Sequence, residues 1–179
     1  MAELHGSVRD GERAAAPGDK PSEGATVVER ITTQDVPEIC ALYRRVWESS
    51  SNPGLPAELA KSWQPTPLEF TSWMEGVTYF AARRDGRLLG VIGCEVAHGN
   101  CHLVHLAVDA DARRKGVGTA LVAAGIEWAR HSGASQVWGD ALAPFSAAIA
   151  LFKHLGFSEC GVLHKHEWNE DVRLFEQIL

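Results

Sequence analysis

The sequence predicts a mixed α/β fold rather than a purely parallel sheet. Three short β-rich runs follow one another between residues 77 and 108, which is typical of an antiparallel meander. After residue 108 the pattern changes to an alternation of helical and strand segments. A chain of 179 residues with 45% hydrophobic residues is long enough to bury one core, so a single domain is the simplest expectation.

The region before the meander predicts a strand and then helices. ATVVERIT (25–32) is a short β-branched run, and Thr32 or Thr33 can cap a helix over 34–47. In that helix Val36, Ile39, Leu42 and Val46 recur at helical spacing. SSSNPGLP (49–56) has the composition of a loop, and a less regular helical region over 59–76 is broken around Pro65 and Pro67.

The meander is predicted from its turns and its alternation. Residues 77–84 and 88–97 are joined by Asp85-Gly86, a strong hairpin signal, and 101–108 follows the Gly99-Asn100 turn. Beyond it, residues 117–131 read as an amphipathic helix ending before Gly133. Residues 135–141 read as a buried strand, 144–155 as a helix opened by Pro144 and stopped by Gly156, and 157–163 and 166–178 as the last strands.

Composition excludes several classes of protein. The formal net charge of −6 argues against a nucleic-acid-binding protein that works by bulk electrostatics. No apolar run is long enough for a membrane span or a signal peptide, and residues 1–24 have the composition of a flexible tail. The four cysteines show no metal-binding spacing, so we expect no metal and a reducing, cytoplasmic location. His164 and His166 are expected to be exposed strand residues.

A basic, glycine-containing turn predicts an anion site. The turn joins a strand to the N-terminus of the helix over 117–131, where unpaired N–H groups and a partial positive charge favour anions. Glycine allows a phosphate to approach the backbone closely. The turn consists of Arg113, Arg114, Lys115, Gly116, Val117, Gly118 and Thr119. A diphosphate ligand would match this set of donors and cations.

Two other phosphate loops compete with this interpretation. A P-loop needs a lysine after its second glycine, and here Thr119 follows Gly118 directly. A dinucleotide fingerprint needs a third glycine, where Leu121 stands. Asp140 nevertheless lies at the end of the next strand, where a ribose-binding acid would be, so a nucleotide-dependent oxidoreductase remains an alternative.

The motif Arg113-x-x-Gly116-x-Gly118 resembles the acyl-CoA loop of the GNAT superfamily of N-acyltransferases. It follows a strand that ends at Leu106-Ala107-Val108, and ALFKHLGF (150–157) is similar to the family's second hallmark, a helix ending in Gly-Phe before a strand. The resemblance covers about residues 25–170. It implies one domain over 25–179 with a mainly antiparallel central sheet and helices on both faces, acetyl-CoA as acyl donor, and a possible homodimer. It also implies that backbone amides of the basic turn bind the pyrophosphate and that an N–H near Leu106 to Val108 polarises the thioester.

The resemblance also suggests catalytic residues. His102 matches the position where some members place a general base, and Glu95 on the preceding strand is the second candidate. His105 would point to the opposite face unless a bulge redirects it. The common general-acid tyrosine is replaced by Phe152, which can at most pack against pantetheine, and a common asparagine is replaced by Phe145. Tyr43 and Tyr79 lie in no recognised motif.

The acceptor is predicted to be a primary amine of a small molecule or peptide, bound by the first helices. That region offers Trp47, Glu48, Trp63, Trp73 and Glu75, and aromatic rings with carboxylates suit a cationic amine, although tryptophans at such spacings are more often core residues. Because Phe152 cannot donate a proton, a non-catalytic acyl-CoA-binding or regulatory module is the alternative function.

Overall fold

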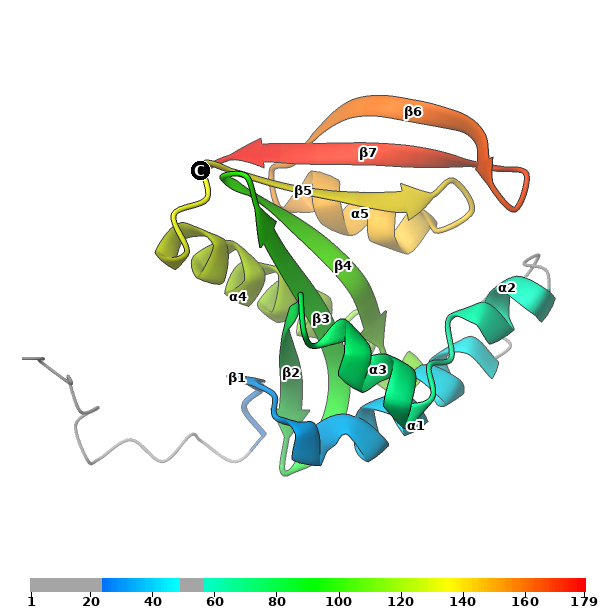
Figure 1. Cartoon of the computed structure of the whole chain (residues 1–179), viewed down its shortest axis with the longest axis vertical. Helices are drawn as coiled ribbons and strands as arrows, with labels where there is room; N and C mark the ends of the chain where they lie inside the picture. Colours follow the sequence, from blue (N-terminus) through cyan, green and yellow to red (C-terminus); the bar gives the residue numbers. More distant parts are fainter. Residues whose placement is uncertain (1–23, 49–56) are drawn as a thin grey trace, which may run out of the picture.

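A single seven-stranded sheet organises the part of the chain that the structure describes. The computed structural model describes residues 24–48 and 57–179. The strands lie in the order β1-β2-β3-β4-β5-β7-β6 (Figure 1). Their bounds are β1 Val27–Arg30, β2 Thr78–Arg84, β3 Arg87–Ala97, β4 Asn100–Val108, β5 Gln136–Leu142, β6 Ser158–Glu167 and β7 Glu170–Ile178. All neighbouring strands are antiparallel except β4 and β5, which confirms the mixed, mainly antiparallel sheet.

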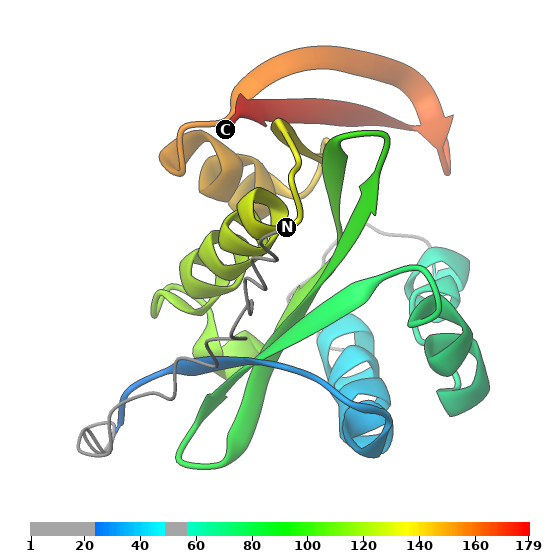
Figure 2. The same cartoon turned by 60° about the vertical axis from the view of Figure 1, so that its left-hand side comes forward.

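Helices cover both faces of the sheet. On one face lie α1 (Val36–Glu48), α2 (Ala57–Ser62) and α3 (Pro67–Trp73); on the other lie α4 (Val117–His131) and α5 (Ser146–His154) (Figure 2). α1 buries Ile39, Leu42 and Val46, as their spacing predicts. Gly125 of α4 lies so close to β4 that an added Cβ would meet Leu103 Cδ2 at 2.8 Å, so this helix packs tightly on its face.

Several boundaries differ from the sequence prediction. Thr32 caps a short 3₁₀ turn (Thr33–Asp35) that precedes α1, and forms a capping box with Asp35. The irregular region over 59–76 is two helices, because Thr66 and Glu69 form a second capping box ahead of Pro67. α5 begins at Ser146 rather than Pro144, since Phe145 has non-helical angles (φ −84°, ψ 63°). The predicted loop over 49–56 and all of the predicted tail except Gly24 lie outside the described residues.

The two parallel strands separate halfway along their length. β4 and β5 pair only from Asn100–Gln136 to Leu103–Gly139, although β4 continues to Val108 and β5 to Leu142. On its other edge β4 stays paired with β3 as far as Val108–Gly90. A fork therefore opens between β4 and β5, directed toward the 109–116 connection and the start of α4.

Two kinds of feature are absent from the described ranges. No helix within them is long and apolar enough to cross a membrane. Within the same residues, no group of three or more His, Cys, Asp or Glu side chains is placed to hold a metal ion.

Candidate functional site

The inner edge of the fork presents backbone groups of β4. The Asp109 amide donates to the Leu89 carbonyl (2.8 Å), which fixes the alternation of the β3–β4 ladder. The backbone N–H and C=O of Ala107, which lies opposite Val91, therefore point toward β3. Those of Leu106 and Val108 point into the fork. Consistent with this, the Val108 carbonyl accepts from Arg113 Nε (3.2 Å) rather than from β3. The fork thus presents main-chain groups of β4 to an extended ligand, apart from the Val108 carbonyl, which Arg113 already occupies.

The basic loop, residues 113–119, lies at the mouth of this fork. Gly116 is the N-cap of α4 in the left-handed region (φ 80°), and no side chain caps the helix. The first intrahelical bond runs from the Ala120 amide to the Gly116 carbonyl, so the amides of Val117, Gly118 and Thr119 precede the helical ladder. Arg114 and Lys115 are exposed beside them. These donors and cations fit a pyrophosphate group.

A buried carboxylate anchors the approach to the basic loop. Asp109 is 6% exposed and receives hydrogen bonds from Arg45 of α1, from Arg87 of β3 and from the Asp111 amide. Burial raises the pKa of Asp109, but Arg87, the Asp111 amide and Arg45 outweigh it, and the net pKa lies below its ordinary value. The end of β4 is therefore tied to two other elements before the loop begins.

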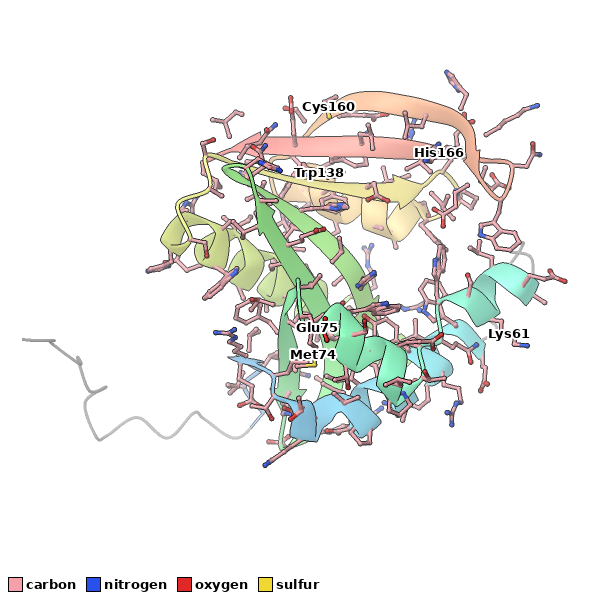
Figure 3. All side chains as sticks on the ribbon, viewed as in Figure 1. Lys61, Met74, Glu75, Trp138, Cys160 and His166 are labelled. Atoms are coloured by element: carbon pink, nitrogen blue, oxygen red, sulfur yellow. The ribbon has the colours of Figure 1, made fainter. Side chains whose placement is uncertain are left out.

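The face of the sheet that carries α1–α3 gathers the titratable side chains. His102 of β4 lies opposite Glu95 of β3 and Trp138 of β5. Its ring stacks on Trp138, which Figure 3 labels on β5, with centroids 3.5 Å apart and planes at 4°. His102 Nε2 donates to Asp140 Oδ1 at 3.0 Å, and Glu95 is exposed. His102, Trp138 and Asp140 thus form one contact group at the base of the fork.

A bulge in β4 brings His105 to the same face. Between Val91 and Gly93 the register of the β3–β4 ladder shifts, and His105 adopts a positive φ of 56°. Its Nδ1 is hydrogen-bonded to the Tyr79 hydroxyl (2.6 Å), and its ring stacks on Trp73 (4.4 Å). The Tyr43 hydroxyl donates to the His105 carbonyl (2.6 Å). β4 is therefore not regular at this point, and the bulge, which the sequence left open, turns His105 to the same face as His102.

The surroundings of His105 weaken it as a base. Burial of part of the ring, with a smaller contribution from His102, lowers its pKa to about 4, and Asp140 opposes this shift. Burial raises the pKa of both Tyr43 and Tyr79 above the ordinary value. At neutral pH the site therefore holds a neutral His105 with two neutral tyrosines. We call His102, His105, Tyr79, Trp138 and Asp140 the histidine face.

Comparison with known proteins settles the family. The model of the acetyltransferase (GNAT) family matches residues 37–157. The chain belongs to this family. A mycothiol acetyltransferase of Clavibacter michiganensis is 26% identical over 151 residues, which are 81% of this chain and 46% of that protein. A ribosomal protein bS18-alanine N-acetyltransferase of Escherichia coli is 30% identical over 94 residues, 52% of this chain and 64% of that protein. The chain therefore covers less than two thirds of either relative.

Solved structures agree on the GNAT fold. The ribosomal-protein-S18-alanine N-acetyltransferase from Escherichia coli superimposes with a TM-score of 0.65 at 23% identity, covering 86% of this chain and 94% of that chain. The PaiA N-acetyltransferase from Thermoplasma acidophilum, solved in complex with coenzyme A, gives 0.72 at 13% identity, covering 87% and 99%. At these identities the likeness concerns the fold.

Two departures from the GNAT pattern lie in or near α5. Phe152 is 4% exposed and packs on Phe157 and Phe175, directly beneath Gly139 of β5. Other side chains of the protein cover almost the whole Phe152 ring. The predicted contact with pantetheine therefore stays a prediction, and it concerns only the small exposed edge of the ring. Phe145 packs against Trp47 (5.9 Å) and Trp63 (5.8 Å). Neither phenylalanine offers a proton donor.

The proposed acceptor residues divide into two groups. Trp47 and Trp63 pack together (4.5 Å) in the cluster with Phe145, which favours a packing role for them. Trp73 covers His105 and also borders an open hollow of about 400 Å³. Glu48 and Glu75 are exposed. The other residues of the hollow are Glu58, Lys61, Ser62, Gln64, Pro65 and Glu69.

Sequence reasoning missed several members of the histidine face. It treated Asp140 only as a possible ribose ligand, and it gave Tyr43, Tyr79 and Trp138 no role. The two tyrosines reach His105 from α1 and β2, far away in the sequence. One signal was available for Trp138 and Asp140: they alternate along β5, so they share a face and would meet whatever β4 places opposite.

Proposed function

We propose that this chain is an acetyl-CoA-dependent N-acetyltransferase that moves the acetyl group directly to a primary amine of a small molecule or peptide. The observation that carries the proposal is the continuity of the fork with the basic loop. The main-chain groups that Leu106 and Val108 turn into the fork lead to the uncapped N-terminus of α4, with Arg114 and Lys115 beside it. A long ligand with an extended amide arm and a diphosphate matches this path.

The chemistry requires little beyond positioning and one base. An N–H of β4 inside the fork would donate to the thioester carbonyl as negative charge develops there. His102 would accept the proton of the attacking amine, with Glu95 as the second candidate. The departing thiolate is a tolerable leaving group, because a thiol titrates near pH 8.5. The reaction is slowed, not prevented, by the absence of a tyrosine at position 152.

The acceptor class follows from the relatives and from the histidine face. One relative is named for alanine of a ribosomal protein and another for mycothiol, so peptide and small-molecule amines are both candidates. Carboxylates and aromatic rings around His102 and Trp73 suit a cationic amine. We extend the proposal to a cytoplasmic location, consistent with Cys40, Cys94, Cys101 and Cys160 all being free thiols. The homodimer remains a proposal that light scattering would test.

The full chain tests the proposal directly. Calorimetry should show saturable binding of CoA, and incubation with acetyl-CoA and an amine panel should release free thiol. The panel should include an alanine-initiated peptide and small diamines. His102→Gln should lower kcat by about 10²–10⁴, the usual contribution of a general base, with CoA affinity unchanged. Absence of CoA binding would refute the proposal.

One observation favours a second candidate function. Phe152 stands where a proton donor is common, and it is buried. A non-catalytic acyl-CoA-binding or regulatory module would bind CoA tightly and release no thiol with any amine of the panel. That outcome would favour the binding module over the enzyme as the function of this chain.

A further inference from the structure

His102 and Asp140 lie where the fork opens. His102–Trp138 and Leu103–Gly139 are the last paired positions of β4 and β5, and Asp140 is the next residue of β5. The Nε2–Oδ1 bond of 3.0 Å therefore spans the two strands at the point where they part. The side chain of His102 is 21% exposed and that of Asp140 39%, so the pair borders the open space and is accessible from it.

The contact fixes which nitrogen of His102 carries the proton. A carboxylate only accepts hydrogen bonds, so the neutral imidazole must hold its proton on Nε2 to bond Asp140. Nδ1 is then the nitrogen with a free lone pair, and the structure gives it no hydrogen bond from the described residues. Stacking on Trp138 holds the plane of the ring. His105 is arranged differently, because its Nδ1 is already bonded to Tyr79.

We propose that Asp140 is a positioning residue that holds His102 in the Nε2–H form, so that Nδ1 accepts the proton of the attacking amine. The assignment rests on the proposed function. The amine nitrogen bonds to the thioester carbon, the C–S bond breaks, and its electron pair leaves on sulfur as the thiolate. The proton lost by the amine goes to Nδ1, and the imidazolium formed there is stabilised by the Asp140 charge until it returns the proton to the thiolate or to water.

Other titratable groups face the His102–Asp140 pair and contribute to the electrostatic potential around it. Glu95 lies opposite His102 on β3, and His105 and Asp140 act electrostatically on each other. Burial raises the pKa of Glu167, with a contribution from Asp140, so this side chain of β6 is also close. Glu176 lies opposite Trp138 on β7 but is hydrogen-bonded to Gln136. The groups that face the pair are Glu95, His105, Glu167 and Glu176.

The tautomer of His102 can be measured by NMR in the absence of any amine substrate. In the ¹⁵N-histidine-labelled full chain, two-bond ¹H–¹⁵N correlations at pH 8 should show His102 as Nε2–H, the signal being assigned by its loss in His102→Gln. In Asp140→Asn the preference for Nε2–H should be lost, because an amide can also donate to Nε2. A His102 signal already in the Nδ1–H form, or unchanged in Asp140→Asn, would overturn the proposal.

A second His–Asp contact supplies the matched control. His164 Nδ1 and Asp171 Oδ2 are 3.2 Å apart on the β6–β7 hairpin, and the Asp171 side chain is 40% exposed, close to the 39% of Asp140. Asp171→Asn should change the His164 signal only. It should leave the His102 tautomer and the acetylation rate unaltered.

The kinetic experiment uses the amine of the panel that is turned over fastest. Asp140→Asn should lower kcat by about 10²-fold, the lower end of a general-base contribution, with the KM for acetyl-CoA unchanged. If Asp140 merely ties β4 to β5, its loss would lower Tm and CoA affinity together with kcat. A chain that acetylates none of the amines refutes the proposed function, whereas the NMR result still decides the role of Asp140.

Discussion

The basic loop lies at the mouth of the fork and the His102–Asp140 pair of the histidine face lies at its base, but the two regions are built in opposite ways. The loop is a contiguous run whose geometry comes from its own residues, with Gly116 in a left-handed conformation at the start of α4. The histidine face is assembled from β2, β4 and β5 and is held by contacts from α1 and α3. Damage to the loop should therefore be local, whereas the histidine face depends on residues distant in the sequence.

Among the variants that test this contrast, Gly116→Val should have the largest effect. A β-branched residue is strained at φ 80°, and its side chain would project into open space in front of the loop, where the protein has no atom within 4 Å. We expect CoA to bind about 10²-fold more weakly, the equivalent of one or two lost hydrogen bonds to a charged group at about 1.5–3 kcal/mol each. Isothermal calorimetry measures this directly.

Gly133→Val is the matched control for that variant. Gly133 follows the other end of α4 with φ 76°, and it too has no atom within 4 Å of an added Cβ. Its replacement should cause a comparable loss of stability and leave CoA affinity intact. Equal weakening of CoA binding by both variants would show that strain in α4, and not the loop, controls affinity.

A smaller effect should come from Tyr43→Phe, which tests the long-range support of the histidine face. The change removes the hydroxyl that bonds the His105 carbonyl and leaves that acceptor unpaired beside a buried ring. The free energy of unfolding should fall by about 1–3 kcal/mol, measured by urea denaturation. CoA affinity should stay at the wild-type value; a parallel loss of affinity would contradict the independence of the two regions.

The same contrast explains which features the sequence predicts. The bounds of α4, the Asp85-Gly86 hairpin and the meander follow from local periodicity and turn residues, and the structure confirms them. The bulge at His105 could be named from the sequence only as a possibility, because it depends on the register between β4 and β3. The contacts of Asp140 and Tyr79 likewise required the strand order. The fork itself has no local signal, because it depends on where two strands distant in the sequence stop pairing.

The smallest effect concerns His105 and acid. Its pKa in the folded chain is about 4, below the ordinary 6.5, so the unfolded chain binds the proton first as the pH falls. The stability that neutral His105 contributes is present above pH 6.5 and is lost as the pH drops toward 4.

His105→Asn should remove this part of the loss, and asparagine suits the test because it tolerates a positive φ. The effect is modest because His105 keeps an exposed face. Urea denaturation at pH 7 and pH 5 gives the free energy of unfolding of the wild type and of the variant. Comparing the two proteins cancels the contributions of the titratable groups that they share. Equal losses in both proteins would mean that the ring is protonated freely in the folded state, and His105 would then compete with His102 as a base.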